Sequence, residues 1–397
     1  MYKRIILILF IFFSQLSFGQ WNKSGNPFYG NKANRSSGIQ IGGFLRFVNY
    51  QQYTKWNEDR YSDYAIHNKL FVYQQFDANN SIYGSIQNRL IFGEAYNLNA
   101  SGYANSLLQN NDLVNLSFIV KEENNYLIHS EIDLLYYKWE SKSTRVKIGR
   151  QRYYWNQSFI WNPNNYLNTY SVLGYDVVNR SGVESISIRT KLGGARSKWN
   201  MDVVYAPHKT MDESIVTSRL HYKSKRTEFQ LLGGSILNDY SGGLGFSTYI
   251  NETGISGEVT YFKAKSDDGF DALLIDLSTY YQFPSKLFLL GEILYHSNPQ
   301  EYFTPTDIFT NRSVKHLITN KLQIAGIMQY PISKRTTIGA SVLYYLDDEY
   351  TSANAFINSK LTKRIEFYLS YNIFGQAETV IDGQSRKYAL AQLAISF

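Results

Sequence analysis

Apolar and polar residues alternate in roughly 10-residue segments along most of the chain, and short polar turns separate these segments. The clearest segment runs from Arg364 to Ile373 and places five apolar residues on one face: Ile365, Phe367, Leu369, Tyr371 and Ile373. Side chains of a strand point to opposite faces in turn, so this pattern predicts a strand with one apolar and one polar face. The same pattern recurs in residues 271–281, 321–330 and 336–346.

About 19 segments of this kind can be marked, whereas bacterial single-chain membrane barrels have an even number of strands. The pattern blurs between Tyr153 and Arg180, where a strand is either hidden or absent. Connections alternate between short ones, such as Asn251-Glu252, and longer ones, such as Ser297–Asn311. The sequence therefore predicts an all-β fold, a closed transmembrane antiparallel β-barrel of about 16 to 18 strands. The alternative is a soluble β-sandwich or solenoid.

The last predicted strand, Arg386–Phe397, alternates in the same way and ends on an aromatic residue. Such a strand resembles the insertion signal of Gram-negative outer-membrane barrels, although Ile395 stands where a second aromatic is usual. We expect this strand to pair with the first one, near Ile39–Tyr50, and to be recognised by the barrel-insertion machinery.

The first residues have the pattern of a secretory signal peptide. Lys3 and Arg4 precede an apolar run from Ile5 to Phe13, and Ser17-Phe18-Gly19 follows. The alternative is a membrane anchor, but the run is shorter than the roughly 20 apolar residues that span a bilayer. We expect a signal peptide at 1–19, a periplasmic lead-in at 20–37 and a single barrel at 38–397, in the bacterial outer membrane.

Composition agrees with a membrane barrel. The chain has 34 Tyr and 24 Phe, and such aromatics suit the belts at the two membrane surfaces. The absence of cysteine argues against a disulfide scaffold and a thiolate metal site. The net charge of +7 is mild, and no basic run with interleaved aromatics points to nucleic acid.

Motifs of enzymes and metal sites are not found. The six His residues form no zinc-protease pattern, and there is neither a nucleophile elbow nor a phosphate-binding loop. We expect no enzyme, no cofactor and no metal. An outer-membrane lipase or protease remains an alternative, because its site would be assembled across strands.

The most distinctive stretch is Lys147–Ser171, KIGRQRYYWNQSFIWNPNNYLNTYS. The run Gly149-Arg150-Gln151-Arg152, then Trp155, then Trp161-Asn162-Pro163-Asn164, resembles a family of porin-like outer-membrane barrels. Asn156 and Asn165 depart from the family pattern, which has Gly and Asp there. The resemblance covers residues 110–210 well and implies a porin-like fold in the outer membrane, without implying a solute.

The residues of this stretch also predict its placement. Thr144, Val146 and Ile148 form an apolar face, so Arg145 and Lys147 point into the barrel. Arg150 and Arg152 then have lipid-facing parity, and either they lie at the rim or a bulge at Gly149 turns them inward. The segment after them has no period and carries the remaining candidates for a constriction: Trp155, Trp161, Asn162 and Asn164. It either folds into the lumen or packs as an extracellular loop.

The preceding strand has the opposite charge. Tyr126, Ile128, Ile132, Leu134 and Tyr136 are predicted to face lipid, which leaves His129, Glu131 and Asp133 facing the lumen. The two acidic residues are expected to form a ladder with Arg145 and Lys147. Such pairs either only satisfy buried charge or set the preference of a pore.

These features together favour an outer-membrane channel for passive diffusion of small hydrophilic solutes, with outer-membrane lipid and these solutes as partners. A small excess of basic residues favours at most a weak preference for anions, and the many tyrosines keep saccharides open. The alternative is a barrel without transport, serving as adhesin, scaffold or partner in a secretion assembly. The sequence leaves the oligomeric state open.

Overall fold

A computed structural model describes residues 38–53, 60–98, 100–108, 113–168, 182–300, 313–318, 320–347, 349–376 and 386–397. The expected signal peptide and lead-in lie outside these residues. The elements of the first half are β1 (Ile39–Tyr53), β2 (Arg60–Gln75), β3 (Asn80–Gly93), α2 (Glu94–Leu98), α3 (Ala100–Leu108), β4 (Ser117–Glu123), β5 (Tyr126–Glu140), β6 (Thr144–Gln151), β7 (Val183–Lys191), β8 (Trp199–Ala206) and β9 (Ile215–Lys223). Those of the second half are β10 (Thr227–Ile236), β11 (Asp239–Ile250), β12 (Thr253–Ala264), β13 (Ala272–Gln282), β14 (Phe288–His296), η4 (Val314–His316), β15 (Leu322–Pro331), β16 (Thr336–Tyr345), β17 (Tyr350–Lys360), β18 (Ile365–Gln376) and β19 (Arg386–Ser396).

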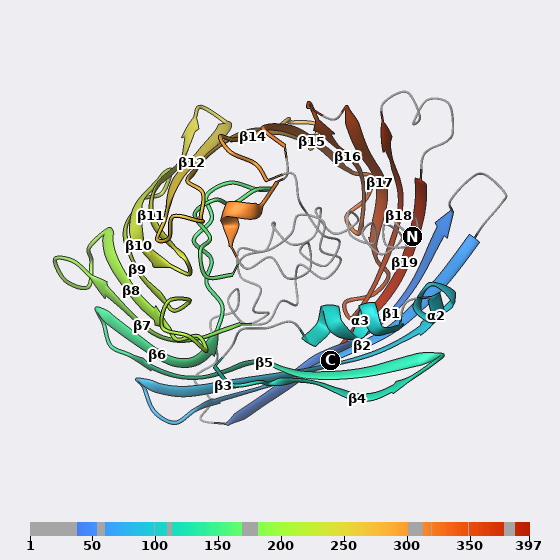
Figure 1. Ribbon diagram of the computed structural model, residues 1–397, viewed down its shortest axis with the longest axis horizontal. Coiled ribbons are helices and arrows are strands. Elements are labelled where there is room, and N and C mark those ends of the chain that lie inside the picture. The colour runs from blue at the N-terminus through green and yellow to red at the C-terminus, as the bar shows by residue number, and fades with distance from the viewer. Residues whose placement is uncertain are drawn as a thin grey trace.

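The strands form one antiparallel sheet that closes on itself (Figure 1). β1 pairs with β2 on one side and with β19 on the other, from Phe44 opposite Ser396 to Tyr53 opposite Lys387. The predicted pairing of the last strand with the first is therefore confirmed. Closure leaves no unpaired sheet edge, which is what a β-protein needs to lie in lipid.

The wall of the barrel has 18 strand positions, here called staves, although the sheet contains 19 strands. β4 and β6 lie on the same side of β5: Ser117 of β4 is opposite Glu131, and Arg150 of β6 is opposite Leu135. β3 covers the other side of β5 over its whole length. The two short strands thus share one stave, which explains why counting alternating segments gives an odd number. The prediction of a closed antiparallel barrel is confirmed at the upper end of its range.

The strands are polar inside and apolar outside. On β12, Tyr261 is 45% exposed on the outer surface, whereas the inward Glu258 is 1% exposed. Exposed apolar side chains recur at outward positions around the whole wall, as in Val72, Ile148, Leu231, Leu277, Met328, Val342 and Leu369. This inversion of the usual arrangement fits a wall surrounded by lipid.

The predicted lipid-facing side of β5 is wrong for Leu134 and Tyr136, which follow Asp133. The register between β3 and β5 shifts at Ser85/Ile86, where Asp133 is the extra residue of a β-bulge on β5. Beyond it Leu134 and Tyr136 face inward, and Tyr136 stacks on Tyr83 with ring centroids 5.5 Å apart. Leu135 is 44% exposed in their place. The bulge adds one residue and therefore exchanges the two faces of the strand.

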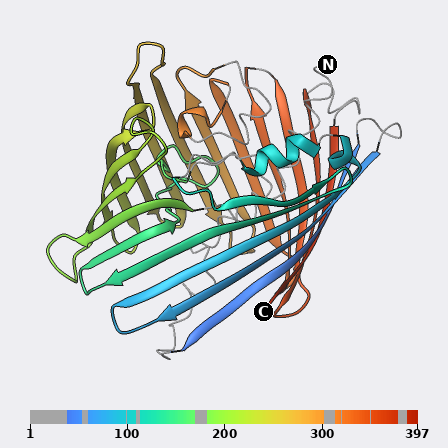
Figure 2. The same cartoon turned by 60° about the horizontal axis from the view of Figure 1, so that its bottom comes forward.

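Connections at the two ends of the barrel differ in length. β9 and β10 are joined by residues 224–226, and β11 and β12 by 251–252, at the end where β1 begins and β19 stops. At the other end, β3 leads through α2, α3 and β4 to β5, and β6 leads to β7 through residues 152–182. Figure 2 shows the long strands β1, β2, β3 and β5 strongly tilted along one side, with α3 near the end that carries the longer connections.

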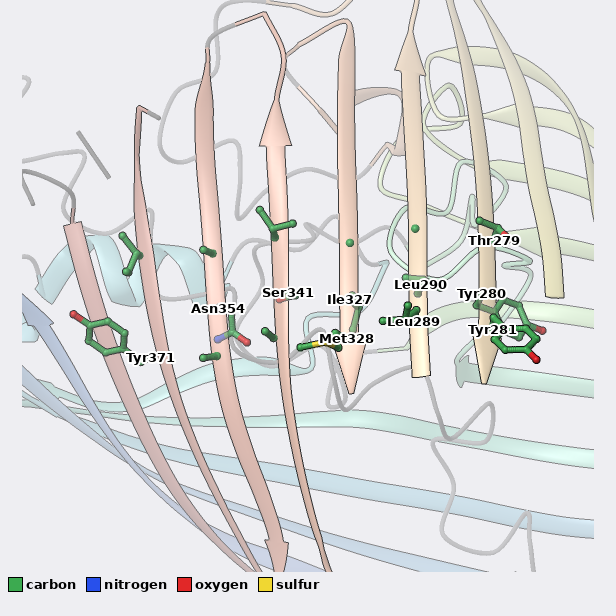
Figure 3. Close-up of a pocket in the computed structure, with 17 residues that line it drawn as sticks. Thr279, Tyr280, Tyr281, Leu289, Leu290, Ile327, Met328, Ser341, Asn354 and Tyr371 are labelled. Atoms are coloured by element: carbon green, nitrogen blue, oxygen red, sulfur yellow. The ribbon is translucent and has the colours of Figure 1, made fainter. Parts of the chain in front are cut away.

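The outer wall carries a hollow of about 700 Å³ across β13–β18 (Figure 3). Small outward residues line it, namely Gly291, Gly326, Ala340, Ala353 and Ala355, together with larger side chains such as Met328 and Tyr371. The hollow is apolar because every outward residue of this wall is uncharged.

Among the described helices, none is long and apolar enough to cross a membrane.

Candidate functional site: the barrel interior

The segment after β6, residues 152–168, lies inside the barrel rather than continuing the wall (Figure 1, green). Trp155, Ile160 and Trp161 are almost completely buried and belong to one apolar cluster with inward residues of β8–β10 and β12–β16. Of the two alternatives for this stretch, folding into the interior is the one that the structure adopts for residues up to 168. Residues 169–180 lie outside the described part of the chain.

Glu258 of β12 holds both limbs of a turn in this segment. Its carboxylate accepts hydrogen bonds from the backbone N–H groups of Gln157, of Ser158 at 3.3 Å and of Asn164 at 2.8 Å. Hydrogen bonds to an ionised acceptor are stronger than those between neutral groups. One buried carboxylate thus satisfies three backbone donors that no strand pairs.

Glu292 of β14 holds the tip of the same turn. It accepts from the backbone N–H groups of Phe159 at 3.0 Å, Ile160 at 2.9 Å and Trp161 at 2.6 Å. Asp276, directly opposite Glu258 in the strand register, is fully buried on the strand between the two glutamates. Two strands, β12 and β14, therefore present carboxylates to the backbone of the inward segment, and Asp276 lies beside them next to Glu292.

The wall is also hollowed to receive Asn164. Its side-chain amide donates to the carbonyl of Leu244 at 2.7 Å and its side-chain oxygen accepts from Thr260 at 2.7 Å. Gly243 and Gly245 face inward beside it on β11. A Cβ at Gly243 would lie 2.4 Å from the Asn164 Oδ1 atom, so these glycines leave the space that the asparagine fills.

Trp155 is held from another part of the wall. Its carbonyl accepts from the side chain of Gln230 at 2.8 Å, and the guanidinium of Arg219 lies 4.9 Å from the centre of its ring. Arg219 in turn pairs with Asp202 at 2.7 Å. A cation over an indole ring is a favourable contact. The segment is therefore attached at its start as well as at its turn.

Two tyrosines of the segment are buried with it. Burial raises the pKa of Tyr153 to about 12, and it raises the pKa of Tyr166 as well. The Tyr153 hydroxyl lies 2.7 Å from the Ser185 hydroxyl. Both phenols consequently stay neutral over the whole physiological pH range.

The wall of β2, β3 and β5 is organised by side-chain pairs instead. Asp133 accepts from Lys69 and Ser85 at 2.5 Å each and from Arg152 at 2.7 Å. Glu131 accepts from Gln87 at 2.8 Å and lies 3.4 Å from Arg89. His129, one of the predicted residues, is fully buried, 3.2 Å from Arg89 and 2.7 Å from Ser117.

Arg150 closes the place where β4 and β6 meet. Its guanidinium donates to the Ile132 carbonyl at 3.1 Å and lies 3.6 Å from Glu184 and 3.8 Å from Glu131. Between these two short strands, β5 lacks a neighbouring strand, so its backbone groups need other partners. The side chain is 1% exposed and belongs to the wall.

Gly149, directly before Arg150 in β6, has a backbone conformation that favours glycine. It has φ of +120°, a conformation that side-chain-bearing residues rarely adopt, and a Cβ there would lie 2.3 Å from the Leu135 carbonyl. Beyond it Arg150 and Gln151 are buried, and Arg152 is partly buried. The predicted alternatives are a position at the rim and an inward switch by a bulge at Gly149, but the strand register shows no shift there. Arg150 is instead buried against Glu131 and Glu184, and Arg152 pairs with Asp133 after the strand has ended.

The residues of the predicted charge ladder between β5 and β6 pair with other residues. The register places Arg145 opposite Glu140 and Lys147 opposite Lys138. Arg145 pairs with Glu140, and the Lys147 amine lies 4.5 Å from the centre of the Tyr136 ring. Glu131 and Asp133 lie nearer the start of β5, outside the part that pairs with β6. They therefore pair with side chains of β2 and β3 and with residues after Gly149.

Among the predicted constriction residues, the structure brings Trp155, Trp161, Asn162 and Asn164 together inside the barrel. The sequence did not point to Glu258 or Glu292, which attach them. A signal was present: each is the one carboxylate in an otherwise uncharged run, GISGEVTYF and FLLGEILY. Such a lone inward charge needs a partner that the strand itself does not supply.

Within the described residues, no group of three or more His, Asp or Glu side chains is placed to hold a metal ion.

Solved structures with the same architecture cover nearly the whole chain. OccAB4 of Acinetobacter baumannii matches with a TM-score of 0.58 and 10% identity over 92% of this chain and 99% of that one. OccAB2 of the same organism matches with 0.58 and 11% identity over 90% and 98%. OccK8 (OprE) of Pseudomonas aeruginosa matches with 0.56 and 9% identity over 90% and 98%.

The chain has the fold of an outer-membrane porin. The porin-like fold implied by the motif around Arg150 is therefore confirmed. At these identities the likeness concerns the fold alone. No family model matches the chain, and no curated protein does.

Proposed function

We propose that this chain is an outer-membrane channel through which small hydrophilic solutes diffuse passively, and that it is not an enzyme. The observation that carries the proposal is the inside-out barrel with an inward segment attached to its wall. A barrel of 18 staves is wide enough for an aqueous lumen, and a segment inside it narrows the passage.

A weak preference for anions belongs to the same proposal. The buried inward side chains of β1–β5 include the cations Arg46, Lys69 and Arg89 and the anions Asp63, Glu131 and Asp133, and Arg152 adds a fourth cation. Four minus three leaves a formal excess of one positive charge on this wall. Charge on a pore wall sets the ion preference of a channel.

Saccharides are the second solute class. Phe71, Tyr83 and Tyr136 form an inward row of stacked rings, with centroids 6.2 and 5.5 Å apart. Phe71 and Tyr83 are buried in this row, so the partly exposed Tyr136 is the ring that a passing sugar would contact. The exported location rests on the expected signal peptide at 1–19 and on recognition of the last strand by the insertion machinery, and the outer face of the barrel would contact lipid.

Planar-bilayer recording of the refolded barrel tests the function. We expect discrete conductance steps and, under a salt gradient, a reversal potential slightly on the anion side. Liposome swelling with sugars of increasing size would give the size limit. A barrel that is folded, as judged by its heat-dependent gel mobility, but gives no steps above background would contradict the channel and favour an adhesin or scaffold.

A further inference from the structure

Glu258 and Glu292 attach one turn of the inward segment from two different strands. Glu258 receives the N–H groups at the two limbs of the turn, and Glu292 receives three successive N–H groups at its tip. A chain segment attached at a single point can pivot, whereas attachment on β12 and on β14 fixes both its position and its orientation.

The two oxygen atoms of each side chain matter for this attachment. A carboxylate offers only acceptors, four lone-pair sites on two oxygens, so it can take three N–H donors at once. A glutamine of the same size has one oxygen and brings an NH₂ group, which would point donors at donors. The backbone N–H groups of residues 157–161 have no strand to pair with, so their partners must come from the wall.

The surrounding wall is shaped for the same purpose. Gly243 and Gly245 leave room for Asn164, and Ile160 and Trp161 pack into the apolar cluster on either side of the carboxylates. Neither glutamate pairs with a described lysine or arginine. Glu258 accepts from the backbone of this segment, and Glu292 does the same while its side chain also contacts Asp276 on the strand between them.

We propose that Glu258 and Glu292 are positioning residues that fix the narrowest part of the lumen and thereby set the size limit for solutes, an inference that rests on the proposed channel function. They act through the backbone of residues 157–164 and do not themselves touch the solute.

The test uses the full barrel with Glu258→Gln, Glu292→Gln and the double substitution. Without both carboxylates the tip of the turn keeps no hydrogen-bond acceptor on β12 or β14, and only Asn164 and Trp155 still bind the segment to the wall. We expect the double variant to show higher and noisier single-channel conductance and to admit larger sugars in liposome swelling. Each single variant keeps one of the two carboxylates and should lie between. Glu140→Gln is the matched control, because Glu140 pairs with Lys138 and Arg145 on β5.

A cysteine pair makes the effect reversible. The chain has no cysteine, and the Thr260 Oγ1 and Asn164 Oδ1 atoms lie 2.7 Å apart, so the two side chains face each other. Asn164→Cys with Thr260→Cys in the double-glutamine background should restore the lower conductance on oxidation and lose it on reduction. A merely structural role of the glutamates would not produce this redox-dependent change.

The outcomes separate the two proposals. A wild-type barrel without conductance overturns the channel function itself. A conducting wild type whose folded double variant keeps both conductance and size limit overturns the positioning role. If the double variant does not fold, the single variants decide: two folded singles with unchanged conductance and size limit overturn it equally.

Discussion

Around Asp133 and Glu131, on the β2–β5 side of the barrel, buried charges meet other side chains, whereas Glu258 and Glu292 on the β12–β14 side meet backbone amides. Asp63, near the end of the first side that carries α2, is the exception there, because it accepts from the backbone N–H groups of Ala95 and Tyr96. Asp133 is surrounded by Lys69, Arg152 and Ser85. Glu258 and Glu292 receive the N–H groups of the inward segment. A change on the first side alters charge and wall stability, and a change on the second side alters where a stretch of chain lies.

The difference follows from what each wall has to satisfy. β4 and β6 meet on one side of β5 and leave a break that Arg150 fills, so side chains there complete the wall. β12, β13 and β14 pair without interruption, so their inward carboxylates are available to a segment that has no strand partner. Selectivity and size limit would therefore be set on different walls.

The largest effect that sharpens this comparison is expected from Arg150→Met. Without the guanidinium, Glu184 and the Ile132 carbonyl lose a buried partner, and breaking a buried pair from one side lowers the free energy of unfolding by about 3–5 kcal/mol. Urea unfolding in lipid vesicles, followed by tryptophan fluorescence, measures this. Arg145→Met is the control: its pair with Glu140 is partly exposed, and we expect about 1 kcal/mol or less. Equal losses in both variants would contradict the role of Arg150 at the junction.

A smaller effect, on selectivity, is expected from Asp133→Asn. The substitution removes one negative charge from a wall that already has a positive excess. A unit charge about 10 Å from a permeating ion in water contributes about 0.4 kcal/mol. The contribution has opposite signs for anions and cations, so removing the charge should change the anion-to-cation permeability ratio about fourfold. The reversal potential under a salt gradient should move toward anions while the conductance keeps its size. Ser85→Ala removes a hydrogen bond to the same carboxylate without changing charge, and it should leave the reversal potential where it is. A shift of the same size in Ser85→Ala would show that charge is not the cause.

The smallest effect is expected from Thr260→Val on the other side. It removes one neutral hydrogen bond to Asn164 and keeps the shape of the side chain, so the free energy of unfolding should fall by about 1 kcal/mol. Because Glu258 and Glu292 still hold the turn, single-channel conductance should not change. If this variant alone opened the channel as far as the double glutamine variant, the attachment would depend on Asn164 instead.

The wall of the barrel was largely predictable. The alternation that places Ile365 and Leu369 outside and Tyr368 and Ser370 inside is a local property of a strand, and the pairing of β19 with β1 follows once the sheet closes. The prediction of inward and outward faces failed on β5, where one extra residue shifts the alternation. The bulge at Asp133 exchanges the faces of Leu134 and Leu135, and no feature of the local sequence distinguishes it from regular alternation.

The interior was predictable only in part. Its residue types and the lack of period after Gln151 indicated a segment that leaves the wall. The attachment of that segment joins residues about a hundred positions apart, as in Gln157 with Glu258 and Phe159 with Glu292. Register around the whole ring decides which inward residues meet it, and a local pattern contains no such information.

The sequence by itself thus determined a closed antiparallel barrel with an apolar outside and a polar inside, because alternation and strand length are set residue by residue. Only the tertiary structure decided that β4 and β6 share a stave, that Arg150 fills the break between them, and that two glutamates hold residues 157–164 inside. These features depend on closure of the ring, which brings distant strands to face a common interior.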